Sequence, residues 1–75
     1  MAGEVEVMMP EVIGTRIAKL MNDNGISRKE LAALCEVTEM TVSLWVRGER
    51  IPSDPMKLKI SQMLHRSVKF IFYTP

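Results

Sequence analysis

The chain has 75 residues, of which 47% are hydrophobic, and its ten basic and nine acidic residues give a formal net charge of +1. A chain of this length forms one domain that buries only about 60% of the surface of the unfolded chain, and this small core argues against most enzymes, which need a deep polar pocket. A single cysteine excludes an internal disulfide framework and a multi-cysteine metal site, so we expect a reducing, cytoplasmic setting with no metal and no cofactor. No apolar run approaches the ~20 residues of a membrane span.

Residues 1–10 are expected to form a flexible acidic leader, and residues 11–75 a helical domain. The leader contains Glu4 and Glu6, no Lys or Arg and no helical periodicity, although the alternation of Val5 and Val7 leaves a short strand as the alternative. From residue 12 onward ten basic residues face six acidic ones, so the formal charge of this part is +4. This charge is only mildly basic for a nucleic-acid-binding protein.

The first helix is predicted from residue 10 or 11 to residue 24. Pro10 suits the first turn of a helix, Glu11 favours the positive end of its dipole, and Asn24-Gly25 provides a left-handed stop. Its apolar stripe consists of Ile13, Ile17, Leu20 and Met21.

Two short helices joined by a tight turn are predicted within residues 27–50. Ser27 and Glu30 have the spacing of a capping box, which predicts a helix from residue 28 to residue 35 or 36. Thr38 is the cap candidate of the next helix, residues 39–47, which Gly48 ends.

Apolar residues of this pair line the faces where the two helices must pack against each other: Leu31, Ala32 and Cys35, then Val42, Trp45 and Val46. The small side chain of Ala32 permits a close, sharp crossing. Such a crossing projects the second helix outward, as in a helix-turn-helix motif that binds DNA.

A fourth helix is predicted from residue 55 to residue 64, after a loop that contains Pro52. Its apolar stripe includes Ile60, Met63 and Leu64, with either Met56 or Leu58 at its start. His65 at its end is expected to cap carbonyl groups rather than to bind a metal.

The segment from residue 68 to the end is ambiguous. Val68, Ile71 and Phe72 fit one face of a helix, which exposes Phe70, whereas Val68, Phe70 and Phe72 fit one face of a strand. Either conformation leaves apolar side chains uncovered, so this tail is predicted to join two copies of the chain. The predicted dimer interface consists of Phe70, Ile71, Phe72 and Tyr73.

Five segments follow one another in a characteristic order: IGTRIAKLMNDNGIS, RKELAALCEVT, MTVSLWVRGER, IPSDPMKLKISQML and SVKFIF. Together, over residues 13–72, they resemble the lambda-repressor-like (Xre/Cro) helix-turn-helix domains of phage and bacterial regulators. The resemblance implies an all-α, compact five-helix domain with the helix-turn-helix at its second and third helices. It also implies that the third helix lies in the major groove while the second crosses the DNA backbone.

Residue roles follow from the same resemblance. The expected contacts with bases are made by Glu39, Met40, Thr41, Ser43 and Leu44, and those with phosphates by Arg28, Lys29, Thr38, Arg47 and Arg50, with Lys57 as a further cation. The chain departs from the family pattern in having Glu36 where the turn often has glycine. It also has Met21 and Val46 where some members pair an arginine with a glutamate.

The predicted function is a cytoplasmic transcriptional regulator, such as a phage or mobile-element repressor or a Cro-like protein, that binds an operator in double-stranded DNA as a homodimer. The alternative is a helix-turn-helix that binds another regulatory protein, as an antirepressor does. The acids Glu36 and Glu39 and the apolar Met40 and Leu44 favour this alternative. Cys35 is expected to be an inert core thiol, and no catalytic constellation is visible.

Overall fold

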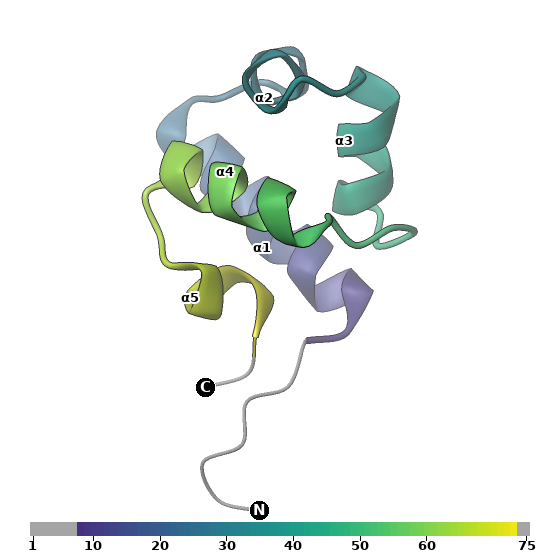
Figure 1. The fold of residues 1–75 in the computed structure, drawn as a ribbon, viewed down its shortest axis with the longest axis vertical. Coiled ribbons are helices and arrows are strands. Elements are labelled where there is room, and N and C mark those ends of the chain that lie inside the picture. The colour runs from purple at the N-terminus through teal and green to yellow at the C-terminus, as the bar shows by residue number, and fades with distance from the viewer. Residues whose placement is uncertain (1–7, 74–75) are drawn as a thin grey trace, which may run out of the picture.

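The computed structural model describes residues 8–73, which form five helices (Figure 1). These are α1 (Pro10–Asn24), α2 (Arg28–Cys35), α3 (Glu39–Val46), α4 (Asp54–Leu64) and α5 (Val68–Phe72). Helix α1 packs against α3, α4 and α5, and α2 packs against α3 and α4. The predicted all-α, five-helix fold is therefore confirmed, with the helix-turn-helix at α2 and α3.

Short-range hydrogen bonds define where the helices begin. The hydroxyl of Ser27 accepts from the backbone N–H of Glu30 at 3.0 Å, while the Ser27 N–H donates to the Glu30 carboxylate at 2.9 Å, which completes the predicted capping box. Thr38 and Ser67 accept equivalent bonds from the third residue of α3 and of α5. At the C-terminal end of α4, His65 has a left-handed backbone (φ 58°). Its backbone N–H, rather than its imidazole, donates to the Ser61 carbonyl.

The core is built from the apolar stripes that the sequence predicts, and Trp45 of α3 is its largest fully buried side chain. On α4, Met56 packs against this core while Leu58 is 55% exposed, which settles the alternative for the start of that stripe. The buried core residues are Met8, Ile13, Ile17, Met21, Leu31, Ala32, Cys35, Val42, Trp45, Ile60, Leu64, Ile71 and Phe72.

Helices α1 and α3 approach each other closely at Gly14. A Cβ atom on Gly14 would lie 2.3 Å from the carbonyl oxygen of Val46 and 2.6 Å from that of Trp45. Only a residue without a side chain fits between the two backbones, so Gly14 sets the distance from which α1 supports the C-terminal half of α3.

The segment that follows α4 is helical, and this resolves the ambiguity at the C-terminal end. Ile71 and Phe72 are fully buried, whereas Phe70 is 40% exposed. Ile71 and Phe72 are therefore core residues of a single chain and are unavailable for the dimer interface that the sequence predicted, which leaves Phe70 and Tyr73 of that set.

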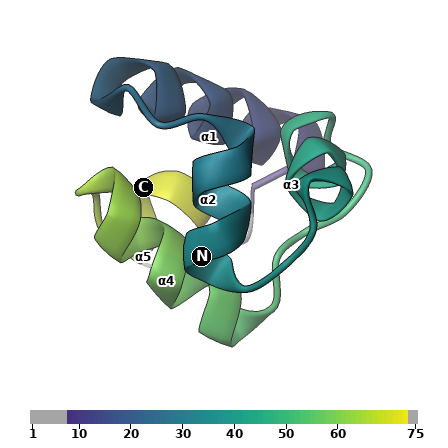
Figure 2. The same cartoon turned by 90° about the horizontal axis from the view of Figure 1, so that it is seen from above.

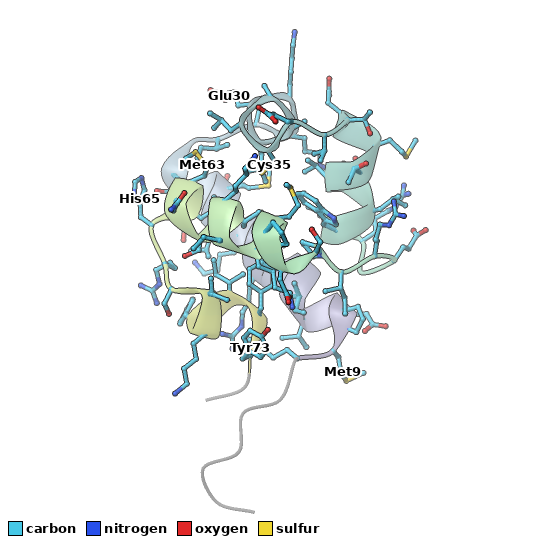
Figure 3. All side chains as sticks on the ribbon, viewed as in Figure 1. Met9, Glu30, Cys35, Met63, His65 and Tyr73 are labelled. Atoms are coloured by element: carbon cyan, nitrogen blue, oxygen red, sulfur yellow. The ribbon has the colours of Figure 1, made fainter. Side chains whose placement is uncertain are left out.

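Three residues of the predicted leader, Met8, Met9 and Pro10, lie on the domain. Met8 is buried, and its backbone N–H donates to the carbonyl of Phe72 at 2.9 Å, while Met9 caps α1. Met9 and Tyr73 lie at the same end of the molecule, opposite Glu30 of α2 (Figure 3). The predictions for residues 1–7, flexible leader or short strand, lie outside the described residues.

Candidate nucleic-acid interface

Helix α3 stands at one side of the molecule, with α2 crossing beside its N-terminal end (Figure 2). Val42 and Trp45 anchor α3 in the core, so the residues between them point away from it. Met40 is 62% exposed, Glu39 is also exposed, and Thr41, Ser43 and Leu44 are half-buried. The five predicted base-contacting residues thus share the outer part of one helix.

The N-terminal turn of α3 is held by two threonines. Thr38 accepts from the backbone N–H of Thr41 at 3.1 Å, and the two hydroxyls are 3.0 Å apart. One hydroxyl hydrogen is used within this pair, which leaves the other hydroxyl able to donate outward.

Arg28 reaches from the start of α2 to the middle of α3. One of its guanidinium nitrogens donates to the hydroxyl of Ser43 at 3.1 Å. A predicted phosphate-contacting residue and a predicted base-contacting residue are thus joined across the helix-turn-helix. Sequence spacing offered no signal for this contact, because the two residues are fifteen positions apart.

The remaining cations lie at the two ends of the motif. Lys29 is exposed in the first turn of α2, while Arg47 and Arg50 are exposed after α3. Arg47 is not free, since its Nε lies 2.8 Å from the carboxylate of Glu49. This exposed ion pair lowers the positive potential at the exit from α3.

Glu36 occupies the turn between the two helices in a left-handed conformation, φ 59°. Its backbone N–H closes α2 by bonding to the carbonyl of Ala33, and its carboxylate lies 3.9 Å from the Nζ of Lys59. Glycine adopts this conformation without strain, so the departure from the family pattern at this position carries a backbone cost.

A hollow of about 280 Å³ lies between α3 and the loop before α4. Thr41 and Arg50, two predicted DNA-contacting residues, line it together with Ile51, Pro52 and Ser53 of the loop. The loop residues were not among the predicted contacts. Their only signal in the sequence is their position directly after Arg50.

The family model for helix-turn-helix proteins matches residues 17–71. The chain belongs to the helix-turn-helix family. Membership of this family indicates a DNA-binding regulator, and the predicted resemblance is confirmed. None of the curated protein sequences matches this chain.

Solved structures of similar fold include two proteins that are named as regulators or controllers. The restriction-modification controller protein C.AhdI from Aeromonas hydrophila is 27% identical, with a TM-score of 0.76, over 84% of this chain and 96% of that protein. The clp gene regulator ClgR from Corynebacterium glutamicum is 23% identical, with a TM-score of 0.79, over 85% of this chain and 68% of that protein. At that identity the likeness to ClgR shows the fold of this helix-turn-helix domain alone.

Lys57 does not lie with the exposed cations that flank α3. Its side chain is 8% exposed, and its Nζ lies 3.3 Å from the Asp54 carboxylate and 3.3 Å from the Tyr73 hydroxyl. The expectation that Lys57 adds to the cations near α3 is therefore wrong. Its ammonium group instead ties α4 to the residue that follows α5.

The free thiol of Cys35 lies under α2 in the core (Figure 3). Burial raises the pKa of this thiol, an effect that the nearby charge of Lys59 partly opposes. Among residues 8–73 no three His, Cys, Asp or Glu side chains gather as metal ligands. None of the helices in that range has the length and apolar content needed to cross a membrane.

Proposed function

We propose that this domain is a cytoplasmic transcriptional regulator of a phage or mobile element that places α3 in the major groove of an operator. The observation that carries the proposal is the outer face of α3, on which Glu39 and Met40 are exposed and which Arg28, Arg47 and Arg50 flank. Cations at both ends of a reading helix suit the phosphates on either side of a major groove. The 27% identity to the restriction-modification controller protein C.AhdI supports a role in regulation.

Base recognition on this face uses few bidentate contacts. Glu39 accepts from a cytosine amino group, while Met40 and Leu44 contact thymine methyl groups. The bond from Arg28 to Ser43 holds the guanidinium beside α3, and the Ser43 hydroxyl keeps its own hydrogen for a base edge. With so few strong contacts, part of the discrimination comes from DNA shape.

The active species is a homodimer that binds two half-sites about 34 Å apart. Because Ile71 and Phe72 are buried, the interface that remains is the apolar end of the molecule, where Met9 and Val12 are exposed and Tyr73 is half-buried. Met9 and Tyr73 lie at the end of the molecule opposite Glu30 of α2, so joining two copies there leaves α2 outside the interface (Figure 3).

The second candidate function is a helix-turn-helix that binds another regulatory protein in place of DNA. Two observations favour it: the side chain of Met40 is 62% exposed at the tip of α3, and Glu49 neutralises Arg47 at 2.8 Å. An exposed apolar side chain beside acids suits a protein surface better than a phosphate backbone.

Selection from random double-stranded DNA separates the two functions. Operator binding predicts enrichment of a palindrome by the wild-type protein, and a changed palindrome for Thr41→Ala or Ser43→Ala. Failure to enrich any sequence, with α3 still folded by circular dichroism, refutes operator binding. The protein-binding alternative then remains, and it predicts that Met40→Ala abolishes capture of the partner regulator.

The salt dependence of operator binding tests the phosphate contacts. Arg28→Ala and Arg47→Ala are each expected to weaken binding to all sequences and to reduce the slope of log K against log salt by about one. Glu49→Ala, which frees Arg47, is expected to strengthen binding. Lys19→Ala on α1 is the control, since Lys19 pairs with Asp23 at 3.1 Å and lies outside the motif. Slopes that do not differ among the four variants contradict the assignment.

A further inference from the structure

A positively charged surface lies away from α3, between α1 and α5. Two hollows of about 370 and 440 Å³ share Arg16 and Phe70 in their walls. The cations around them are Arg16 and Lys19 of α1, Arg66 of the link between α4 and α5, and Lys69 of α5. We call these four cations with Phe70 the α1–α5 patch.

Charge is concentrated in this patch. Four cations and one acid, Asp23, line the two hollows, which gives a formal charge of +3, whereas the whole chain carries +1. The motif that is proposed to bind DNA, residues 27–50, has four cations and four acids, so its formal charge is zero; the acids are Glu30, Glu36, Glu39 and Glu49. By formal charge, the α1–α5 patch therefore attracts anions more strongly than the helix-turn-helix motif does.

Phe70 holds two guanidinium groups in place. The guanidinium carbon of Arg66 lies 3.8 Å from the centre of the Phe70 ring, and that of Arg16 lies 5.0 Å from it. Arg16 also donates to the backbone carbonyl of Phe70. A guanidinium that rests on an aromatic ring keeps N–H groups free at its edge, which is the geometry that binds a carboxylate through two parallel hydrogen bonds.

We propose that the α1–α5 patch binds an acidic peptide segment of another protein, in which carboxylates alternate with apolar side chains. The carboxylates pair with Arg16 and Arg66, and the apolar side chains enter the hollows against Leu20 and Phe70. The free edges of the guanidiniums supply the specificity for acids. Because the walls of the hollows are apolar, the ligand must carry apolar side chains as well as negative charge.

The same features argue against the other occupants. A second copy would bring like charges together, because a twofold axis through the patch opposes Arg16, Arg66 and Lys69 with the same residues of the other copy. Stacking of nucleic-acid bases needs a free aromatic face, but guanidinium groups cover Phe70. A duplex held by α3 does not reach the patch, since α3 and α5 lie on opposite sides of the molecule in two perpendicular views (Figures 1 and 2).

This position defines what the partner does. A protein bound at the α1–α5 patch leaves α3 uncovered, so the partner and DNA bind this domain at the same time. Binding of the acidic segment does not depend on operator binding, and it is measured without DNA.

The test uses a fluorescein-labelled peptide in which pairs of Glu alternate with Phe, and fluorescence anisotropy with the full chain. Saturable binding that weakens as salt is added is expected. Replacing Glu by Gln, or Phe by Ala, in the peptide is expected to weaken peptide binding at least tenfold. This is roughly the loss of affinity that follows when one partner of a desolvated contact is removed. Absence of saturable binding up to millimolar protein, or equal binding of the Gln peptide, overturns the proposal.

A matched pair of variants locates the site. Arg66→Gln and Lys59→Gln each remove one positive charge, and Lys59 is a half-buried residue of α4 outside the patch. We expect Arg66→Gln to weaken peptide binding by about tenfold and Lys59→Gln by less than about twofold. Equal effects would mean that net charge alone attracts the peptide, and this overturns the proposal.

Two further measurements assign the patch to another occupant if the proposal is wrong. Random-sequence duplex DNA that displaces the peptide from wild-type protein would make the patch a phosphate-binding surface. A shift from dimer to monomer in Arg66→Gln by analytical ultracentrifugation would make it an interface between copies. Both variants are checked by circular dichroism and Trp45 fluorescence, so a loss of binding is not confused with unfolding.

Discussion

Replacing Gly14 by alanine tests whether the backbone contact between α1 and α3 holds the domain together. The new Cβ atom would lie 2.3 Å from the Val46 carbonyl oxygen and 2.6 Å from that of Trp45. Non-bonded heavy atoms prefer about 3.5 Å, so α1 and α3 must separate by roughly 1 Å. Both obstacles are backbone atoms, which no rotamer change moves aside.

Two opposing terms decide the sign of the change in stability. Alanine in the interior of a helix is favoured over glycine by about 1 kcal/mol. Overpacking of this kind costs about 3 kcal/mol, because separation of the helices also loosens the contacts around Trp45. The net expectation is a loss of about 2 kcal/mol, a large part of the total of roughly 4–11 kcal/mol for a chain of this length.

Urea unfolding followed by circular dichroism and Trp45 fluorescence measures this loss, and in thermal unfolding it corresponds to a decrease in Tm of about 8–16 °C. Thr15→Ala is the matched control, since Thr15 is the next residue of α1, is exposed, and gains the same kind of helix propensity without a clash. A Gly14→Ala protein as stable as wild type, or more stable, refutes the reasoning, because helix propensity would then outweigh the close approach.

Two other substitutions test the helix ends. Glu36→Gly is expected to stabilise the domain by about 0.5–1 kcal/mol, since it relieves a left-handed backbone (φ 59°), whereas Glu36→Gln keeps the strain and serves as the control in urea unfolding. Equal midpoints for the two variants would show that the turn is unstrained. The Ser27 backbone N–H lowers the pKa of Glu30 by donating a hydrogen bond to its carboxylate. Ionised Glu30 therefore stabilises the folded state at pH values above its unfolded-state pKa. This contribution disappears as the pH falls through the lowered folded-state pKa. The stability difference between wild type and Glu30→Gln is therefore expected at neutral pH and absent in acid, and a difference that does not change with pH would exclude this linkage.

Local patterns in the sequence were sufficient for the first four helices and for the fold class, whereas the structure decided that residues 68–72 are helical. The cap at Ser27, the stop at Gly25 and the apolar stripe of α1 depend on residues within four positions of each other, and such short-range contacts can be inferred from spacing. The exposure of Phe70 in a helical tail follows from the same periodicity. The outer face of α3 could be predicted because Val42 and Trp45 determine which side of that helix is buried.

Contacts between distant residues were decided only by the tertiary structure. Lys57 lies between apolar neighbours in the sequence, yet its ammonium group reaches Tyr73, sixteen residues away, and its side chain is buried. Arg28 meets Ser43, and Gly14 meets the backbone of Val46, because α2 and α1 both cross α3. Periodicity shows which face of a helix is buried, but the partner of each face depends on how the helices are arranged in space, and that arrangement minimises the free energy of the whole core.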